Sequence, residues 1–230
     1  MFRRPVDRTR KGRRPTLKTY SLIFDTEQLG CVRYGIPRLG KVLNANQIHG
    51  TFFITGFVKW VYPHILESIR AFGEVGIHGL YHEPLNGLST DAQIELIRQM
   101  VRYIGGEVRG ANFLGRMDEE TLTAMIRCGI DYYVSDAVVK FGIGGFEVHD
   151  PLPRAHMLLN RTIWEFPVSV ETYSYPWLAI KNRIEAVELC LQDSLYKHMT
   201  ILCHPFRDGN LANIQTVSRI VRLRSTPFVA

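Results

Sequence analysis

The apolar residues of this chain form short runs that alternate with longer segments of helical periodicity. Runs rich in β-branched and aromatic residues lie at 19–24, 50–54 and 75–77. Each run is followed by apolar positions three or four residues apart, the spacing of a helix that buries one face. The clearest helical pattern covers residues 90–104, where Thr90 and Gln93 form a candidate capping box. The first half of the chain therefore predicts repeated β-then-α units.

The second half continues the alternation less regularly. We predict strands at 107–109, 131–135, 162–167 and 199–203, and helices starting at Asp118 and covering 180–195 and 211–222. A last short run lies at 227–229, and residues 137–161, which are rich in Gly and Pro, are predicted to form long loops. Seven or eight β/α units favour a parallel sheet closed into a barrel, with an open doubly wound sheet as the less favoured alternative.

The charge of the chain is concentrated at its beginning. The whole chain has a net charge of +6, but residues 1–18 contain eight Lys and Arg against one Asp, which leaves −1 for residues 19–230. We therefore predict a basic, disordered tail over 1–18 and one catalytic domain over 19–230. The tail is expected to be solvated, with weak contact to anionic surfaces as the alternative and no specific nucleic-acid partner.

The sequence lacks the patterns of secretion, membrane insertion and paired-cysteine sites. No apolar segment follows the basic residues as a secretory signal requires, and none approaches the roughly 20 apolar residues of a membrane span, so we expect a cytoplasmic protein. The four cysteines contain no Cys-x-x-Cys pair, which argues against a zinc ribbon or a dithiol redox site.

The candidate chemistry begins with two histidines four residues apart, His78 and His82, directly after an apolar run. On a helical turn this spacing lets both imidazoles face one point. A catalytic metal needs about three protein ligands, so the pair predicts a further ligand elsewhere. Asp25 and Glu27, at the end of the first predicted strand, are the best candidates, although they could instead cap the next helix.

Other polar residues also follow predicted strands, namely Arg109, Asp136 and His204. In β/α barrels the active site is built at the carboxyl ends of the strands, so all these side chains are expected on one rim. Carboxylates, imidazoles and an arginine suit metal-assisted hydrolysis, in which one carboxylate takes a proton from water and one imidazolium returns a proton to the leaving group.

These residues resemble, in order, the motifs of the polysaccharide deacetylases with a NodB homology domain (carbohydrate esterase family 4), whose fold is an irregular (β/α) barrel. The resemblance rests on the segments 24–27, 50–56, 78–82, 109–133 and 202–205. It implies that Asp25 is the general base, that His204 is the general acid, and that His78 and His82 bind the metal. Arg109 would hold the base in place, with Arg116 as the alternative.

The first motif departs from the commoner family pattern of two adjacent aspartates, because Thr26 follows Asp25. One branch of the family spaces its acids as Asp-x-Asp, which makes Glu27 the expected third metal ligand. The resemblance then implies a hydrolase that removes N-acetyl groups from a sugar or glycan with a divalent ion, zinc first and cobalt or another ion as alternatives. Two other functions stay open: hydrolysis of a non-sugar C–N amide such as a ureide, and an inactive carbohydrate-binding barrel.

Overall fold

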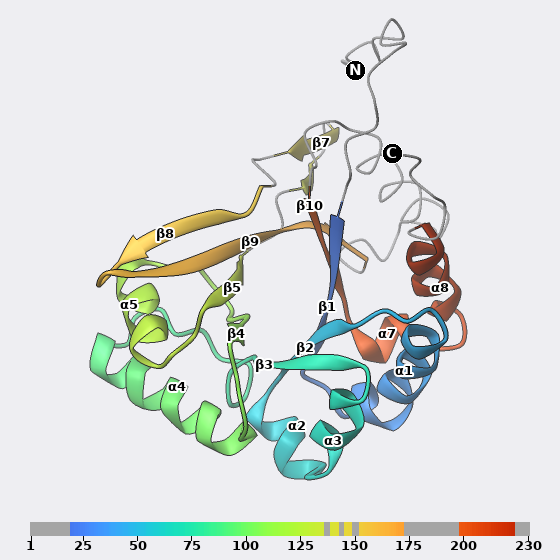
Figure 1. Cartoon of the computed structure of the whole chain (residues 1–230), viewed down its shortest axis with the longest axis horizontal. Helices are drawn as coiled ribbons and strands as arrows, with labels where there is room; N and C mark the ends of the chain where they lie inside the picture. Colours follow the sequence, from blue (N-terminus) through green and yellow to red (C-terminus); the bar gives the residue numbers. More distant parts are fainter. Residues whose placement is uncertain (1–18, 136–138, 143–144, 149–151, 173–197, 224–230) are drawn as a thin grey trace, which may run out of the picture.

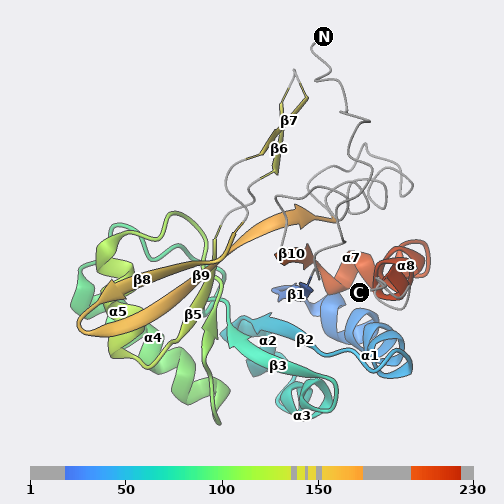
Figure 2. The same cartoon turned by 45° about the horizontal axis from the view of Figure 1, so that its top comes forward.

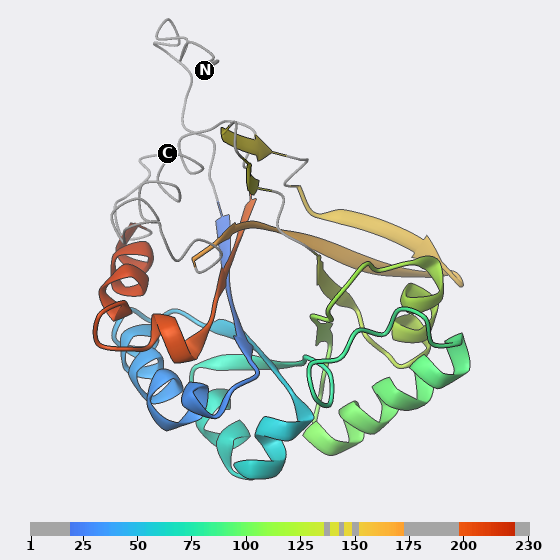
Figure 3. The same cartoon turned by 180° about the vertical axis from the view of Figure 1, so that it is seen from behind.

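The computed structural model describes residues 19–135, 139–142, 145–148, 152–172 and 198–223, and within them seven parallel strands form a closed barrel. The strands pair in the order β10-β1-β2-β3-β4-β5-β9, and the ring closes because β9 also pairs with β10 (Figures 1 and 3). They are β1 (Thr19–Thr26), β2 (Gly50–Ile54), β3 (Gly73–Ile77), β4 (Gly110–Ala111), β5 (Tyr132–Ser135), β9 (Arg161–Glu171) and β10 (His198–Cys203). The predicted barrel is confirmed.

Helices cover the outside of this ring (Figure 1). They are α1 (Ile36–Ala45), α2 (Gly56–Val61), α3 (Ile65–Arg70), α4 (Thr90–Ile104), α5 (Glu119–Arg127), α7 (Pro205–Asp208) and α8 (Ile214–Leu223). None of the helices in the described ranges is both long and apolar enough to cross a membrane.

The pleat of the strands divides the apolar residues between two clusters. Leu22 and Phe24 belong to the large cluster between the strands and the helices, whereas Ile23 belongs to a small cluster. The small cluster also contains Phe53, Val134, Val168 and Leu202, and it fills the inside of the barrel. Alternate residues of each strand therefore point either into the barrel or outward.

Two helix starts show how local sequence fixes the elements. Asp118 caps α5 as predicted, because its Oδ1 accepts the backbone N–H of Thr121 at 2.9 Å. The predicted helix over 90–104 is also present as α4, but its cap is Ser89, whose hydroxyl accepts the N–H of Ala92. The prediction of Thr90 as the cap was wrong by one residue.

Residues 137–161, predicted as loops, contain strands instead. A hairpin is formed by β6 (Val139–Gly142) and β7 (Gly145–Val148), and β8 (Arg154–Leu158) pairs antiparallel with β9 outside the ring (Figure 2). The alternation of apolar and polar residues is weak in this part of the sequence because β8 is largely exposed. Pairing with β9 holds it in place. The helix predicted over 180–195, the run at 227–229, the tail 1–18 and Asp136 lie outside the described residues.

One further element is absent from the sequence prediction, a π-helical turn named η1 (Cys31–Gly35) that leads into α1. Here α7 packs closely against Gly35, where an added Cβ would lie 2.2 Å from the carbonyl oxygen of Pro205. A π-helical turn inside a longer helix is often found beside a functional site. This turn begins four residues after Glu27.

Candidate active site

Three polar side chains converge at the carboxyl end of the barrel because of the pleat. Asp25 continues the inward-facing series of Ile23, and His204 continues that of Leu202. On β3 the residues Val75 and Ile77 face outward, so His78 faces inward at the same rim. Asp25 and His78 are almost completely buried, with 5% and 2% of their surfaces exposed.

Glu27, His78 and His82 form a compact cluster. Glu27 Oε2 lies 3.5 Å from His78 Nε2 and 3.1 Å from His82 Nε2, and the three ligand atoms are all within 4.8 Å of one another. Two imidazole nitrogens and one carboxylate oxygen are a known ligand set for catalytic zinc, which leaves a coordination position open. The structure therefore brings together the three residues that the sequence predicted as metal ligands.

The two histidines meet through a loop and not through the helical turn that their spacing suggested. Gly79 and His82 both have positive φ, +84° and +69°, which reverses the chain between the two imidazoles. The Glu83 carboxylate holds the loop by accepting the N–H groups of Leu80 at 2.9 Å and Tyr81 at 2.5 Å. A non-glycine residue with positive φ is strained, so these contacts stabilise the position of His82.

His78 is oriented by the backbone of Asn112. Its Nδ1 forms a short hydrogen bond with the Asn112 carbonyl oxygen, which can only accept, so the proton lies on Nδ1. The lone pair of Nε2 then points toward Glu27. Among the described residues this buried Nε2 has no hydrogen-bond partner, which fits an imidazole arranged to bind a metal ion.

Asp25 is held by the side chain of the same residue. Asn112 Nδ2 donates to Asp25 Oδ1 at 2.8 Å, while Asp25 Oδ2 lies 3.7 Å from His78 Nε2. Asn112 was missed in the sequence because β4 was placed at 107–109, whereas the strand is Gly110–Ala111. Once the strand is placed correctly, Asn112 is the polar residue that follows it.

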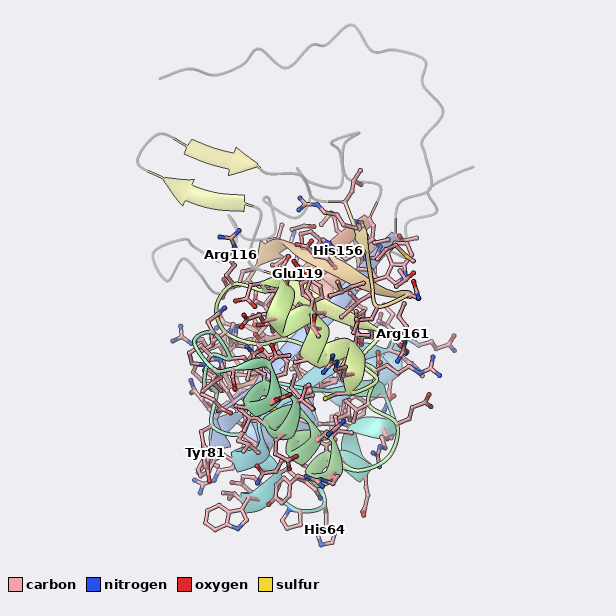
Figure 4. All side chains as sticks on the ribbon, turned by 90° about the vertical axis from the view of Figure 1, so that its left-hand side faces the viewer. His64, Tyr81, Arg116, Glu119, His156 and Arg161 are labelled. Carbon is pink, nitrogen blue, oxygen red and sulfur yellow. The ribbon has the colours of Figure 1, made fainter. Side chains whose placement is uncertain are left out.

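Arg109 is not at this site. It precedes β4, at the opposite end of the barrel, and its guanidinium Nε donates to Glu107 at 2.6 Å with Asp131 4.0 Å away. Its side chain is 59% exposed. The predicted role of holding Asp25 is therefore wrong for Arg109, and Asn112 occupies that place. Arg116 follows β4 but is exposed in the loop before α5 (Figure 4).

His204 lies at the same rim, between β10 and α7. Its backbone N–H donates to Asp208 Oδ2 at 2.7 Å, and Thr172 donates to the same oxygen at 2.8 Å. The Nδ1 atom of His204 is 3.9 Å from Oε1 of Glu171, the last residue of β9. Glu171 was also missed, although a carboxylate at a strand end is the signal that identified Asp25.

The cluster shifts the proton affinities of its members. Burial alone would raise the pKa of Glu27, but the nearby imidazoles of His78, His82 and His204 hold its pKa below the usual value. Burial and the charge of His78 lower the pKa of His82. Burial also acts to lower the pKa of His78, but the Asp25 and Glu27 carboxylates raise it overall. An ionised Glu27 and a neutral His82 are the forms that bind a cation.

Glu171, the carboxylate beside His204, has a raised pKa, in contrast to Glu27. Burial raises the pKa of Glu171, and the negative charge of Asp25 adds to this effect, while His204 acts against it. Cys203, next to His204, is fully buried, and burial raises the pKa of its thiol well above the usual value. A thiol in this environment is a poor nucleophile, so the chemistry of the rim depends on carboxylates and imidazoles.

The sequence and the fold are similar to those of known proteins. A family model described as polysaccharide deacetylase matches residues 12–132. A protein from Mycobacterium smegmatis described as a polysaccharide deacetylase superposes with a TM-score of 0.77 at 17% identity, covering 93% of this chain and 85% of that one. The comparison with curated protein sequences gave no significant match.

Two other similar structures differ in stated activity. The allantoinase PuuE has a TM-score of 0.73 at 15% identity, covering 92% of this chain and 85% of that chain. A carbohydrate esterase family 4 pseudoenzyme from Bacillus anthracis has a TM-score of 0.61 at 16% identity, covering 93% of this chain and 63% of that chain. At these identities the similarity shows the fold and leaves the reaction to be argued from the residues.

Proposed function

The chain belongs to the polysaccharide deacetylase family, and we propose that it removes N-acetyl groups from a sugar by metal-assisted hydrolysis. The observation that carries this proposal is the convergence of Glu27, His78 and His82 within 4.8 Å, beside the buried carboxylate of Asp25. Water adds its oxygen to the acetyl carbon, the C–N bond breaks, and the products are acetate and the sugar amine.

Each residue of the rim has a role that follows from its position. A divalent cation held by Glu27, His78 and His82 would supply a Lewis acid that polarises the acetyl carbonyl and acidifies a water molecule. Asp25 accepts the proton of the water, and the Asn112 amide keeps its carboxylate in place. His204, which follows β10, the strand paired with β1, donates a proton to the leaving nitrogen.

The replacement of the second adjacent aspartate of the first motif by Thr26 is compatible with this arrangement. Thr26 is fully buried, and its hydroxyl donates to the Phe24 carbonyl at 3.4 Å, so it faces away from the cluster. Asp25 and Glu27, two residues apart at the end of a strand, share the inner face. This supports Glu27 as the anionic ligand and makes an inactive barrel the weaker alternative.

The substrate class has two candidates. An N-acetylated sugar is favoured by family membership, and the cytoplasmic location predicted from the sequence would favour a soluble or lipid-linked saccharide over cell-wall polymer. Hydrolysis of a ureide is the alternative, because the allantoinase PuuE has a similar barrel. Acetate release from N-acetylglucosamine oligomers and hydrolysis of allantoin, measured in parallel on the zinc-loaded protein, separate the two.

Metal binding is tested directly by calorimetric titration of the metal-free protein with Zn²⁺, with Co²⁺ in parallel. The wild type is expected to bind one ion per chain. Glu27→Gln is expected to lose more than the roughly 10- to 100-fold in affinity that removal of an outer-shell partner costs, because an anionic ligand is lost. Asp25→Asn is expected to bind Zn²⁺ but lose nearly all turnover, because water keeps its proton.

Glu107→Gln is the matched control, since this exposed carboxylate pairs with Arg109 at the other end of the barrel. It should keep both zinc affinity and turnover. The assignment is reversed if Asp25→Asn binds no metal while Glu27→Gln stays loaded and active. A wild type that binds no divalent ion and turns over neither substrate would leave the inactive barrel as the better description.

A further inference from the structure

A hollow of about 610 Å³ lies on the outside of the barrel, between α2 and α4. Its walls come from three segments: Phe57 and Trp60 of α2, Tyr81 of the loop between the two histidines, and Gln99, Arg102 and Tyr103 of α4. We refer to these six residues as the aromatic groove. Pockets of roughly 300 to 1,000 Å³ are the size that binds small molecules.

The aromatic side chains of the groove face solvent to an unusual extent. Trp60 is 68% exposed, Tyr81 is 77% exposed and Tyr103 is 42% exposed. Large apolar rings are normally buried, and a group of them around a hollow indicates a binding surface. Phe57 and Trp60 contact each other with their ring centroids 6.3 Å apart, which orders that wall.

The groove is connected to the active site through the loop that positions His82. Tyr81 directly precedes His82, so the two Cα atoms are about 3.8 Å apart. The first turn of α2 also binds this loop, because Gly56 N–H donates to Gly79 O at 2.9 Å and Phe57 N–H donates to Leu80 O at 2.8 Å. Figure 4 shows Tyr81 at the same edge of the molecule as Arg116, in a loop that follows a barrel strand.

The polar groups of the groove are neutral or cationic. Gln99 brings an amide, and Arg102 brings a guanidinium, of which Nη2 pairs with Glu95 at 2.7 Å while its other N–H groups can donate elsewhere. A sugar ring presents apolar C–H faces and hydroxyl edges, which fit flat aromatic side chains and a few hydrogen-bonding groups. A phosphate or polyanion would be expected to meet several cations, and the groove offers one.

From this combination we propose that the aromatic groove binds the sugar units that extend from the acetylated residue. The natural substrate is then an N-acetylated oligosaccharide and not a single acetylated sugar. This inference rests on the proposed deacetylase function, since the groove would guide the glycan toward the rim formed by Asp25 and Glu27.

The test compares two substrates of different length on the zinc-loaded full chain, N-acetylglucosamine and its β-1,4-linked tetrasaccharide. Wild type is expected to prefer the tetrasaccharide in kcat/KM. Trp60→Ala should reduce this preference about tenfold, the order expected for the loss of one aromatic contact. Trp164→Ala is the matched control, because Trp164 is also exposed, at 46%, but lies on β9 across the barrel from α2 (Figure 1).

The control should keep the preference, and Zn²⁺ content and thermal unfolding of each variant show that the fold and the metal site are intact. The proposal is overturned if Trp60→Ala and Trp164→Ala show the same preference as wild type. It is also overturned if Trp60→Ala reduces turnover of both substrates equally, because the residue would then act on the reaction centre.

A binding measurement separates failure of the groove from failure of the deacetylase function. If neither sugar is deacetylated, the tetrasaccharide is titrated calorimetrically into wild type, Trp60→Ala and Trp164→Ala. Binding that depends on Trp60 supports the groove while the proposed reaction fails. No binding to wild type overturns the groove, and so does self-association of wild type that disappears in Trp60→Ala, which would identify a protein contact.

Discussion

Asn112 makes two separable contacts, and the substitution Asn112→Ala removes one of them. The backbone carbonyl that orients His78 stays in place, because it does not depend on the side chain. The amide that donates to Asp25 at 2.8 Å is lost. Both residues are buried, with 9% of Asn112 and 5% of Asp25 exposed, so water does not readily replace the missing donor.

A hydrogen bond to a charged group contributes about 1.5 to 3 kcal/mol. Losing it leaves the buried carboxylate of Asp25 without this donor, so the carboxylate is no longer held in place. Because Asp25 is the proposed base, kcat/KM at neutral pH should fall by about 10- to 100-fold, since about 1.4 kcal/mol corresponds to a factor of ten in rate. Stability at neutral pH should fall by about 1.5 to 3 kcal/mol.

The stability effect is measured by urea unfolding of wild type and Asn112→Ala at neutral pH. A buried carboxylate that loses its hydrogen-bond donor destabilises the fold, so the urea midpoint of Asn112→Ala should be lower. This comparison does not require a known substrate.

The assay measures kcat/KM for the N-acetylated tetrasaccharide at neutral pH, with Zn²⁺ content checked in each variant. Asn86→Ala is the matched control, because the Asn86 amide donates to the Arg116 carbonyl and to Asp118, away from Asp25. An unchanged kcat/KM in Asn112→Ala, together with an unchanged urea midpoint at neutral pH, would refute the reasoning for both residues.

Three further substitutions test the other assignments. Arg109→Ala should keep kcat/KM and zinc content, because this exposed side chain pairs with Glu107 and Asp131; a large loss of activity would contradict its exclusion from the site. His204→Ala should keep zinc and lose about 10²- to 10⁴-fold in kcat, the range for general acid catalysis; an empty metal site would instead make His204 a ligand. Asp118→Ala should cost about 1 kcal/mol at neutral pH through loss of the helix cap. Hydrogen bonds from the Thr121 backbone and hydroxyl lower the pKa of Asp118, so this stability is lost as the pH falls through that lowered pKa, and urea unfolding of wild type and variant should converge in acid.

The sequence by itself determined the elements whose pattern is local. Helix α4 follows from the spacing of its apolar residues, and α5 follows from Asp118 and the stripe after it. Strand β1 ends where apolar residues give way to Asp25 and Glu27, which is why the acids were found. Because side chains alternate along a strand, this short stretch also fixes that both acids share one face.

The tertiary structure alone decided the position of β4 and the partner of Asp25. Gly110 and Ala111 have no β-branched or aromatic side chain, so nothing local marks them as a strand. They are ordered by pairing with β3 on one side and β5 on the other. That pairing moves Arg109 to one end of the barrel and brings Asn112 to the other, across 87 residues of sequence from Asp25.

The sequence predicted which residues form the candidate metal site, but not the geometry that brings them together. The four-residue spacing of His78 and His82 identified the pair, but the turn that joins them has two residues with positive φ and depends on Glu83 and on the first turn of α2. Glu171 reaches His204 because β9 pairs with β10 to close the ring. Local patterns fix which residues end a strand, whereas pairing between distant strands decides which of those residues meet.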